Sequence, residues 1–225
     1  MFDIYFAPNR AFARQKDKPV WLVPLIIALV FNMLIALLSA QYVDWDKQKQ
    51  FAMDRMRAQN MTEEQVQQAT GRMDKFYSNP IMRYGAPPVS AFFISLIGVF
   101  FLAIVYNVSL PLLGGTSDFM RALAVVCNAG LVAVPSAIVR AGLVLLKRSS
   151  EVTTSLLLAA PGLKPGFLTV VLSRVDVFAI WQLILCALGL SVVFNLKGAK
   201  SYVLVFAVWA VLTLVFALLG GRAGR

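Results

Sequence analysis

The sequence predicts an all-α, polytopic membrane protein with five transmembrane helices, an amphipathic N-terminal segment and a helical extramembrane hairpin. Of its 225 residues, 59% are hydrophobic and only 14% are charged, whereas a soluble domain has about 45–50% apolar and about 25% charged residues. Four runs lack Asp, Glu, Lys and Arg, and each exceeds or matches the ~20 residues that cross a bilayer as a helix. They cover residues 19–43, 84–117, 177–196 and 201–221.

A fifth apolar stretch, residues 119–146, contains only Arg121 and Arg140 as charged residues. A membrane β-barrel is excluded, because barrel strands alternate apolar and polar residues and these runs do not. The whole chain is therefore expected to form one membrane domain over residues 1–225. Its expected segments are a head at 1–18, transmembrane helices at 20–43, 88–113, 118–147, 170–195 and 201–220, a polar hairpin at 44–86 and a loop at 148–168.

The head mixes aromatic and basic side chains, which is typical of a segment lying at the membrane surface. We expect an amphipathic helix over residues 2–14, with Pro8 near its start or at a bend. A signal peptide is excluded, because the following apolar run is 25 residues long, against about 7–15 for a signal sequence. The side chains expected to meet the helix bundle, the acyl chains or the headgroups are Phe6, Arg10 and Phe12.

The polar hairpin begins its second helix with a capping box, in which Thr62 and Gln65 satisfy each other's backbone amides. A narrow apolar stripe follows at helical spacing, consisting of Val66, Ala69, Met73 and Phe76. Two interpretations stay open. The stripe either rests on the membrane or the bundle, or it forms a docking surface for another protein.

The third span contains Pro135, which should kink it. The fourth is preceded by Asp176, and Arg140 lies within the third. Either Asp176 marks the membrane edge, with the fourth span beginning at Val177, or the carboxylate pairs with Arg140 between two antiparallel helices. An unpaired charge costs about 2.5–3.5 kcal/mol at a helix centre, and a salt bridge would offset part of that cost.

The chain lacks the residues that most catalytic sites need. It contains no histidine, which removes imidazole catalysis and His-ligated metals. Cys127 and Cys186 lie inside predicted spans and are expected to pack as small apolar residues. The serines within spans have no base beside them. We therefore expect no catalytic, cofactor-binding or metal-binding residues, and no enzymatic activity.

Three stretches resemble the bacterial branch of the YIP (Ypt-interacting protein) domain family. They are FAPNRAFARQKDKPVWLVPLIIA at 6–28, LGGTSDFMRALAVVCNAGLVAVPSAIV at 113–139 and VDVFAIWQLILCALGLSVV at 175–193. The resemblance implies a five-span protein of the bacterial inner membrane with a cytoplasmic N-terminus. Charge counts alone lean the other way, since seven basic residues would lie inside and twelve outside.

Eukaryotic members of that family bind small GTPases, partly through a longer N-terminal domain, and that activity is not carried over because only about 18 residues precede the first span. Some bacterial members accompany ABC-type exporters. The expected function is a non-catalytic membrane scaffold or accessory subunit that binds other membrane proteins, such as exporter components, or a second copy of itself. The alternatives are a small channel or transporter with a polar site at Arg140 and Asp176, or a lipid-interacting, membrane-shaping protein. Nucleic acid is not an expected partner, because no basic soluble domain is present.

Overall fold

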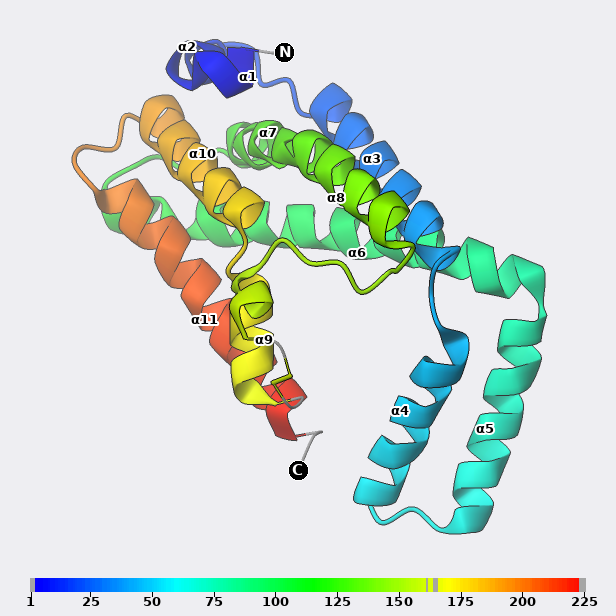
Figure 1. The fold of residues 1–225 in the computed structure, drawn as a ribbon. Helices are drawn as coiled ribbons and strands as arrows, with labels where there is room; N and C mark the ends of the chain where they lie inside the picture. The colour runs from blue at the N-terminus through cyan, green and yellow to red at the C-terminus, as the bar shows by residue number, and fades with distance from the viewer. Residues whose placement is uncertain (1–2, 161, 164–165, 223–225) are drawn as a thin grey trace. The chain divides into compact units, whose positions relative to one another are not determined.

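The computed structural model describes residues 3–160, 162–163 and 166–222, which form α-helices joined by turns and short 3₁₀ helices (Figure 1). The N-terminal elements are α1 (Asp3–Phe6), α2 (Pro8–Ala13), α3 (Leu22–Ala40), α4 (Trp45–Ala58), α5 (Glu63–Ser78), α6 (Pro80–Ser109) and η1 (Pro111–Leu113). The C-terminal elements are α7 (Phe119–Ala129), η2 (Gly130–Val132), α8 (Ala133–Lys147), η3 (Leu156–Ala159), α9 (Phe167–Arg174), α10 (Val177–Phe194) and α11 (Lys200–Arg222).

Five segments are long and apolar enough to cross a membrane, as the sequence predicts. They are Leu22–Ala40, Pro80–Ser109, Phe119–Lys147, Val177–Phe194 and Lys200–Leu219. The third is 61% buried and the second only 11%. The third span is therefore mainly in contact with protein, whereas most of the second is left for lipid.

The second span differs from the prediction at its start. It was expected from residue 88, but α6 already begins at Pro80 and continues through Pro87 and Pro88. The side chain of Asn79 accepts a hydrogen bond from the amide of Ile81 at 2.9 Å, and proline is favoured in the first helical turn because its missing N–H would be unpaired there anyway. At about 1.5 Å per residue, this 30-residue helix is longer than the ~30 Å hydrocarbon core.

The third and fourth spans are each interrupted. A 3₁₀ turn, η2, separates α7 from α8, and Pro135 lies in the first turn of α8. The fourth span was expected over residues 170–195, but α9 ends at Arg174 and a separate helix, α10, begins at Val177. Backbone geometry explains the second break, because Val175 is extended and the adjacent Asp176 forms an isolated antiparallel bridge with Ser155.

The chain divides into two compact units. The first comprises Met1–Asn32, Ala91–Ala137 and Val177–Leu212, and the second comprises Met33–Ser90, Ile138–Asp176 and Thr213–Arg225. In the first unit, α10 packs against α7, η2 and α2. In the second, α4 packs against α5, and α9 packs against η3.

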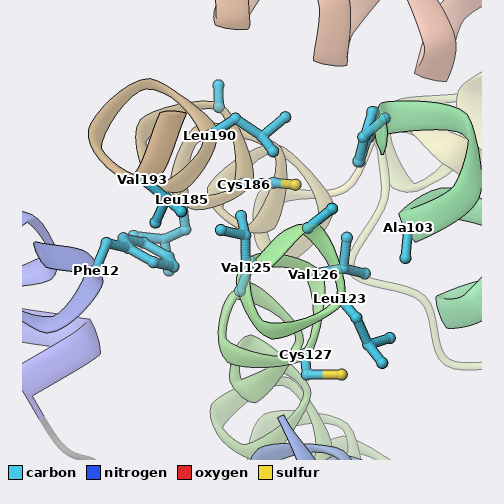
Figure 2. Packing of buried hydrophobic residues seen from close by; sticks show 14 of the residues in the cluster. Phe12, Ala103, Leu123, Val125, Val126, Cys127, Leu185, Cys186, Leu190 and Val193 are labelled. Carbon is cyan, nitrogen blue, oxygen red and sulfur yellow. The ribbon is translucent and has the colours of Figure 1, made fainter. Parts of the chain in front are cut away.

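The core of the first unit is closed by a residue of the head. Phe12 in α2 is 0% exposed, and its ring lies against α7 and α10 beside Val125 (Figure 2). A Cβ added at Gly189 in α10 would lie 2.7 Å from Phe12 Cε1 and 2.7 Å from Val125 Cγ1. Glycine at 189 therefore makes the space that the Phe12 ring occupies.

We predict that Gly189→Ala destabilises the protein, because overpacking a core costs about 1–3 kcal/mol, more than the ~1 kcal/mol that alanine gains in helix propensity. Thermal unfolding in detergent measures the change. Gly142→Ala in α8 is the matched control, since a Cβ there would meet nothing within 4 Å. A variant Phe12→Leu combined with Gly189→Ala should lose less than the sum of the two single losses. Equal stability of Gly189→Ala and the wild type would contradict the close contact.

Candidate interaction surfaces

The head is folded onto the first unit instead of lying free at the surface. Its predicted helix is two short helices, α1 and α2, with the bend at Ala7 and Pro8 in the first turn of α2. Residue 2, the first residue of that predicted helix, lies outside the described residues. Phe12 is buried, but Phe6 is 88% exposed and Arg10 is also exposed.

Two hydrogen bonds join the head and its linker to the third span. The Tyr5 hydroxyl donates to the Leu131 carbonyl at 2.7 Å. That carbonyl would pair with the amide of residue 135 in a regular helix, but Pro135 has no N–H, and the Ala133 amide is its other donor. The Asn128 side chain donates to the carbonyl of Val20 at 2.8 Å, just before α3 begins at Leu22. Both backbone carbonyls therefore accept a hydrogen bond from a side chain of another segment.

The environment of the head shifts two pKa values. Burial raises the pKa of Tyr5, whose ring also packs against Trp181 with centroids 5.8 Å apart. Arg14 forms an ion pair with Asp3, and the hydrogen bond and charge of that guanidinium lower the pKa of the carboxyl. At its other end the head is tied to the turn after α10, where Lys16 Nζ donates to Asn195 Oδ1 at 2.7 Å.

The hairpin is the second surface, and its helices run side by side in Figure 1. Asp44 caps α4 by accepting from the Lys47 amide at 3.0 Å, and the capping box predicted at Thr62 and Gln65 is present. Two ion pairs join the helices or their turn, Lys49 Nζ–Asp74 Oδ1 at 2.6 Å and Arg57 Nε–Glu63 Oε1 at 3.0 Å. The hairpin is thus held largely by its own caps and charges.

A groove of about 420 Å³ lies between the two hairpin helices. Its lining combines polar groups with soft apolar ones, namely Gln48, Phe51, Ala52, Arg55, Met56, Gln59, Met73 and Tyr77. The covered side of α5 bears Val66 and Thr70, which are buried, and Met73 and Tyr77, which are half-buried. Of the predicted stripe, Val66 and Met73 lie on this side, but Phe76 is 44% exposed. Phe51 in α4 is similarly exposed, at 45%.

An aromatic cluster closes the base of the hairpin. Trp45 and Tyr77 stack with centroids 4.4 Å apart, and the Arg83 guanidinium lies 5.7 Å from the Trp45 ring centroid. This cluster was not predicted from the sequence. Their spacing, with one aromatic at the start of α4 and one near the end of α5, was the pattern that could have indicated them.

Asp176 and Arg140 occupy different settings. The Thr154 hydroxyl donates to the Asp176 carboxylate, and the Leu156 amide donates to the Val175 carbonyl at 2.9 Å. Arg140 is exposed on α8. Ion pairs among the described residues include Arg14–Asp3, Lys47–Glu151, Lys49–Asp74, Arg57–Glu63 and Arg121–Asp118. The pairing of Arg140 with Asp176 stays a prediction.

The polar and sulfur-containing residues of the spans serve packing in the described part of the chain. Cys127 and Cys186 are buried free thiols on α7 and α10 (Figure 2). Asn32 and Ser95, from α3 and α6, approach to 3.5 Å. Among the described residues, no group of three or more His, Cys, Asp and Glu could hold a metal ion.

A family model described as the Yip1 domain matches residues 2–219, nearly the whole chain. No curated protein and no solved structure matches it significantly.

We predict that Tyr5→Phe destabilises the protein by about 1 kcal/mol, because the Leu131 carbonyl loses the hydrogen bond from the Tyr5 hydroxyl. The effect should depend on pH. The folded-state pKa of Tyr5 is raised above the usual 10.0, so its contribution is fully present below pH 10 and is lost as the pH rises through the folded-state value. The unfolding temperatures of the wild type and Tyr5→Phe should differ at pH 7.5. The two temperatures should lie closer together above pH 10. A difference that is independent of pH would rule out this role.

Three substitutions distinguish a contact of Asp176 with Thr154 from a salt bridge of Asp176 with Arg140. If its main role is the contact with Thr154, Asp176→Asn and Thr154→Val should both lower the midpoint of thermal unfolding, since hydrogen bonds to charged groups contribute about 1.5–3 kcal/mol. Arg140→Gln should then have little effect. If the carboxylate pairs with Arg140, Arg140→Gln should be as harmful as Asp176→Asn, and the swap Arg140→Asp with Asp176→Arg should restore part of the loss.

Proposed function

The chain belongs to the Yip1 domain family, and from that premise we propose that it is a non-catalytic membrane scaffold or accessory subunit that binds another membrane protein. The family assignment agrees with the resemblance drawn from the sequence. Family members are generally non-catalytic, multi-pass membrane proteins. The resemblance to bacterial members supports a place in the bacterial inner membrane with the N-terminus in the cytoplasm.

The observation that carries the proposal is the groove of the α4–α5 hairpin. Outside the five candidate spans, this hairpin presents two half-exposed phenylalanines, Phe51 and Phe76, and a groove to which Met56 and Met73 contribute. Methionine and aromatic side chains adapt to apolar surfaces and are enriched at the centres of protein interfaces. The hairpin is also preformed by its caps and ion pairs, so binding would cost little ordering entropy.

The charges of the hairpin favour a protein partner over a lipid surface. Residues 44–86 contain seven basic and six acidic side chains, and several of them pair with each other or with Glu151. A nearly neutral surface gains little from anionic headgroups. Since the chain is membrane-embedded, its partner is expected in or at the same membrane, and an ABC-type exporter component is the class that the resemblance favours.

Photo-crosslinking in native membranes tests the proposal. A crosslinking amino acid at position 73, in the groove, or at position 51 should yield one discrete adduct. The same crosslinking amino acid at position 68, on an exposed side of α5, is the matched control and should yield no such adduct. Phe51→Ser with Phe76→Ser should remove the adduct formed from position 73 while circular dichroism stays unchanged.

The mass of the adduct identifies the partner class. An adduct of twice 24.7 kDa indicates a second copy of the chain, and another mass indicates a different subunit, which mass spectrometry identifies. Equal adducts from positions 68 and 73, or none from 51 and 73, would overturn docking at the groove. Ion flux from liposomes that contain only this protein would instead favour the channel alternative.

A further inference from the structure

Hydrogen bonds hold three segments of the first unit together, and two of these segments carry six of its seven basic residues. Lys16 of the head donates to Asn195 in the turn after α10 at 2.7 Å. Lys200, at the start of α11, donates to the Leu113 carbonyl of η1 at 2.9 Å. The head, the turn between α10 and α11, and the η1 turn are therefore neighbours. We call the cations of the head and of the α10–α11 turn, together with Arg121 in the first turn of the following helix α7, the basic face: Arg10, Arg14, Lys16, Lys18, Arg121, Lys197 and Lys200.

The basic face carries a net positive charge. The first unit contains these seven cations but only three acids, Asp3, Asp17 and Asp118. Asp3 pairs with Arg14 and Asp118 with Arg121. Lys16 and Lys200 donate to neutral oxygens, so these contacts bring no acidic group beside them. Within the described part of the chain, the side chains of Arg10, Lys18 and Lys197 make no hydrogen bond or ion pair, and all three are exposed.

Two of the same segments also expose large apolar side chains. Phe6 in α1 is 88% exposed and Leu112 in η1 is 86% exposed. An exposed apolar side chain beside unpaired cations is typical of protein surfaces that rest at the boundary of headgroups and acyl chains. The hairpin of the second unit lacks the charge excess, with seven basic against six acidic residues in 44–86.

We propose that the basic face is a binding surface for anionic phospholipids, in which Arg10, Lys18 and Lys197 contact headgroup phosphates while Phe6 and Leu112 enter the acyl region. A phospholipid headgroup and free phosphate both present an oxyanion to these cations. The exposed Phe6 and Leu112 favour the phospholipid as the ligand. The tie between Lys16 and Asn195 links the head to the α10–α11 turn, so a lipid bound across both segments would also hold the head against the helices. Bound lipid should therefore stabilise the fold.

Thermal unfolding in a neutral detergent tests this inference. Titration with phosphatidylglycerol should raise the unfolding midpoint, whereas equal amounts of phosphatidylcholine or of inorganic phosphate should not. The triple variant Arg10→Gln, Lys18→Gln, Lys197→Gln should weaken the apparent affinity for phosphatidylglycerol by about a hundredfold, since each cation near an anionic surface contributes about fivefold. The matched triple Arg72→Gln, Lys75→Gln, Lys147→Gln alters exposed cations of the second unit and should leave the affinity unchanged.

Four outcomes would overturn the inference. They are equal weakening by the two triples, a similar rise with phosphatidylcholine, a similar rise with inorganic phosphate, and no rise with phosphatidylglycerol. Circular dichroism in phosphatidylcholine micelles first establishes that each variant is folded. If the triple variant does not fold, Lys197→Gln alone provides the test, because Lys197 lies in an exposed turn, and it should weaken the affinity about fivefold.

Discussion

In a bilayer, a backbone carbonyl without a hydrogen-bond donor costs on the order of several kcal/mol, because no water is present to replace the lost partner. Pro135 removes one backbone donor from the third span, and the Val20 carbonyl lies just before the first span begins. The structure supplies side-chain donors to both regions within the first unit, with Tyr5 donating to Leu131 and Asn128 donating to Val20. The head therefore contributes a hydrogen bond to the backbone of the third span.

Packing around α10 follows from the same arrangement. Once Tyr5 fixes α1 beside the third span, the following helix brings Phe12 against α10, and only glycine at position 189 leaves room for the ring. Asn195 and Gly198, both at positive φ, then turn the chain from α10 into α11 and place Lys197 and Lys200 near the head. One set of contacts thus positions the core and gathers the cations on the surface.

The sequence predicts the structure best where helices face lipid. Runs without charge locate the five spans, because a charged side chain is costly in lipid. The capping box at Thr62 likewise locates the start of α5. The sequence predicts the structure least well at prolines, since a proline can either end a helix or lie within its first turns. The second span was expected to begin at residue 88, but α6 begins at Pro80 and contains Pro87 and Pro88. Pro135 predicted a kink, but it did not indicate that Tyr5 donates to this part of the span. Long-range partners of this kind are not encoded in local spacing. The apolar stripe of α5 was similarly ambiguous, since residues 76 and 77 both continue a helical pattern and only contact with α4 selects Tyr77.

The hydrogen bond between Tyr5 and Leu131 spans 126 positions of sequence, which has a consequence for biogenesis. The head precedes the third span in the chain, so it cannot dock until the two intervening spans and the hairpin have been synthesised. Docking of the head, and with it closure of the core around Phe12, is accordingly a late event in assembly.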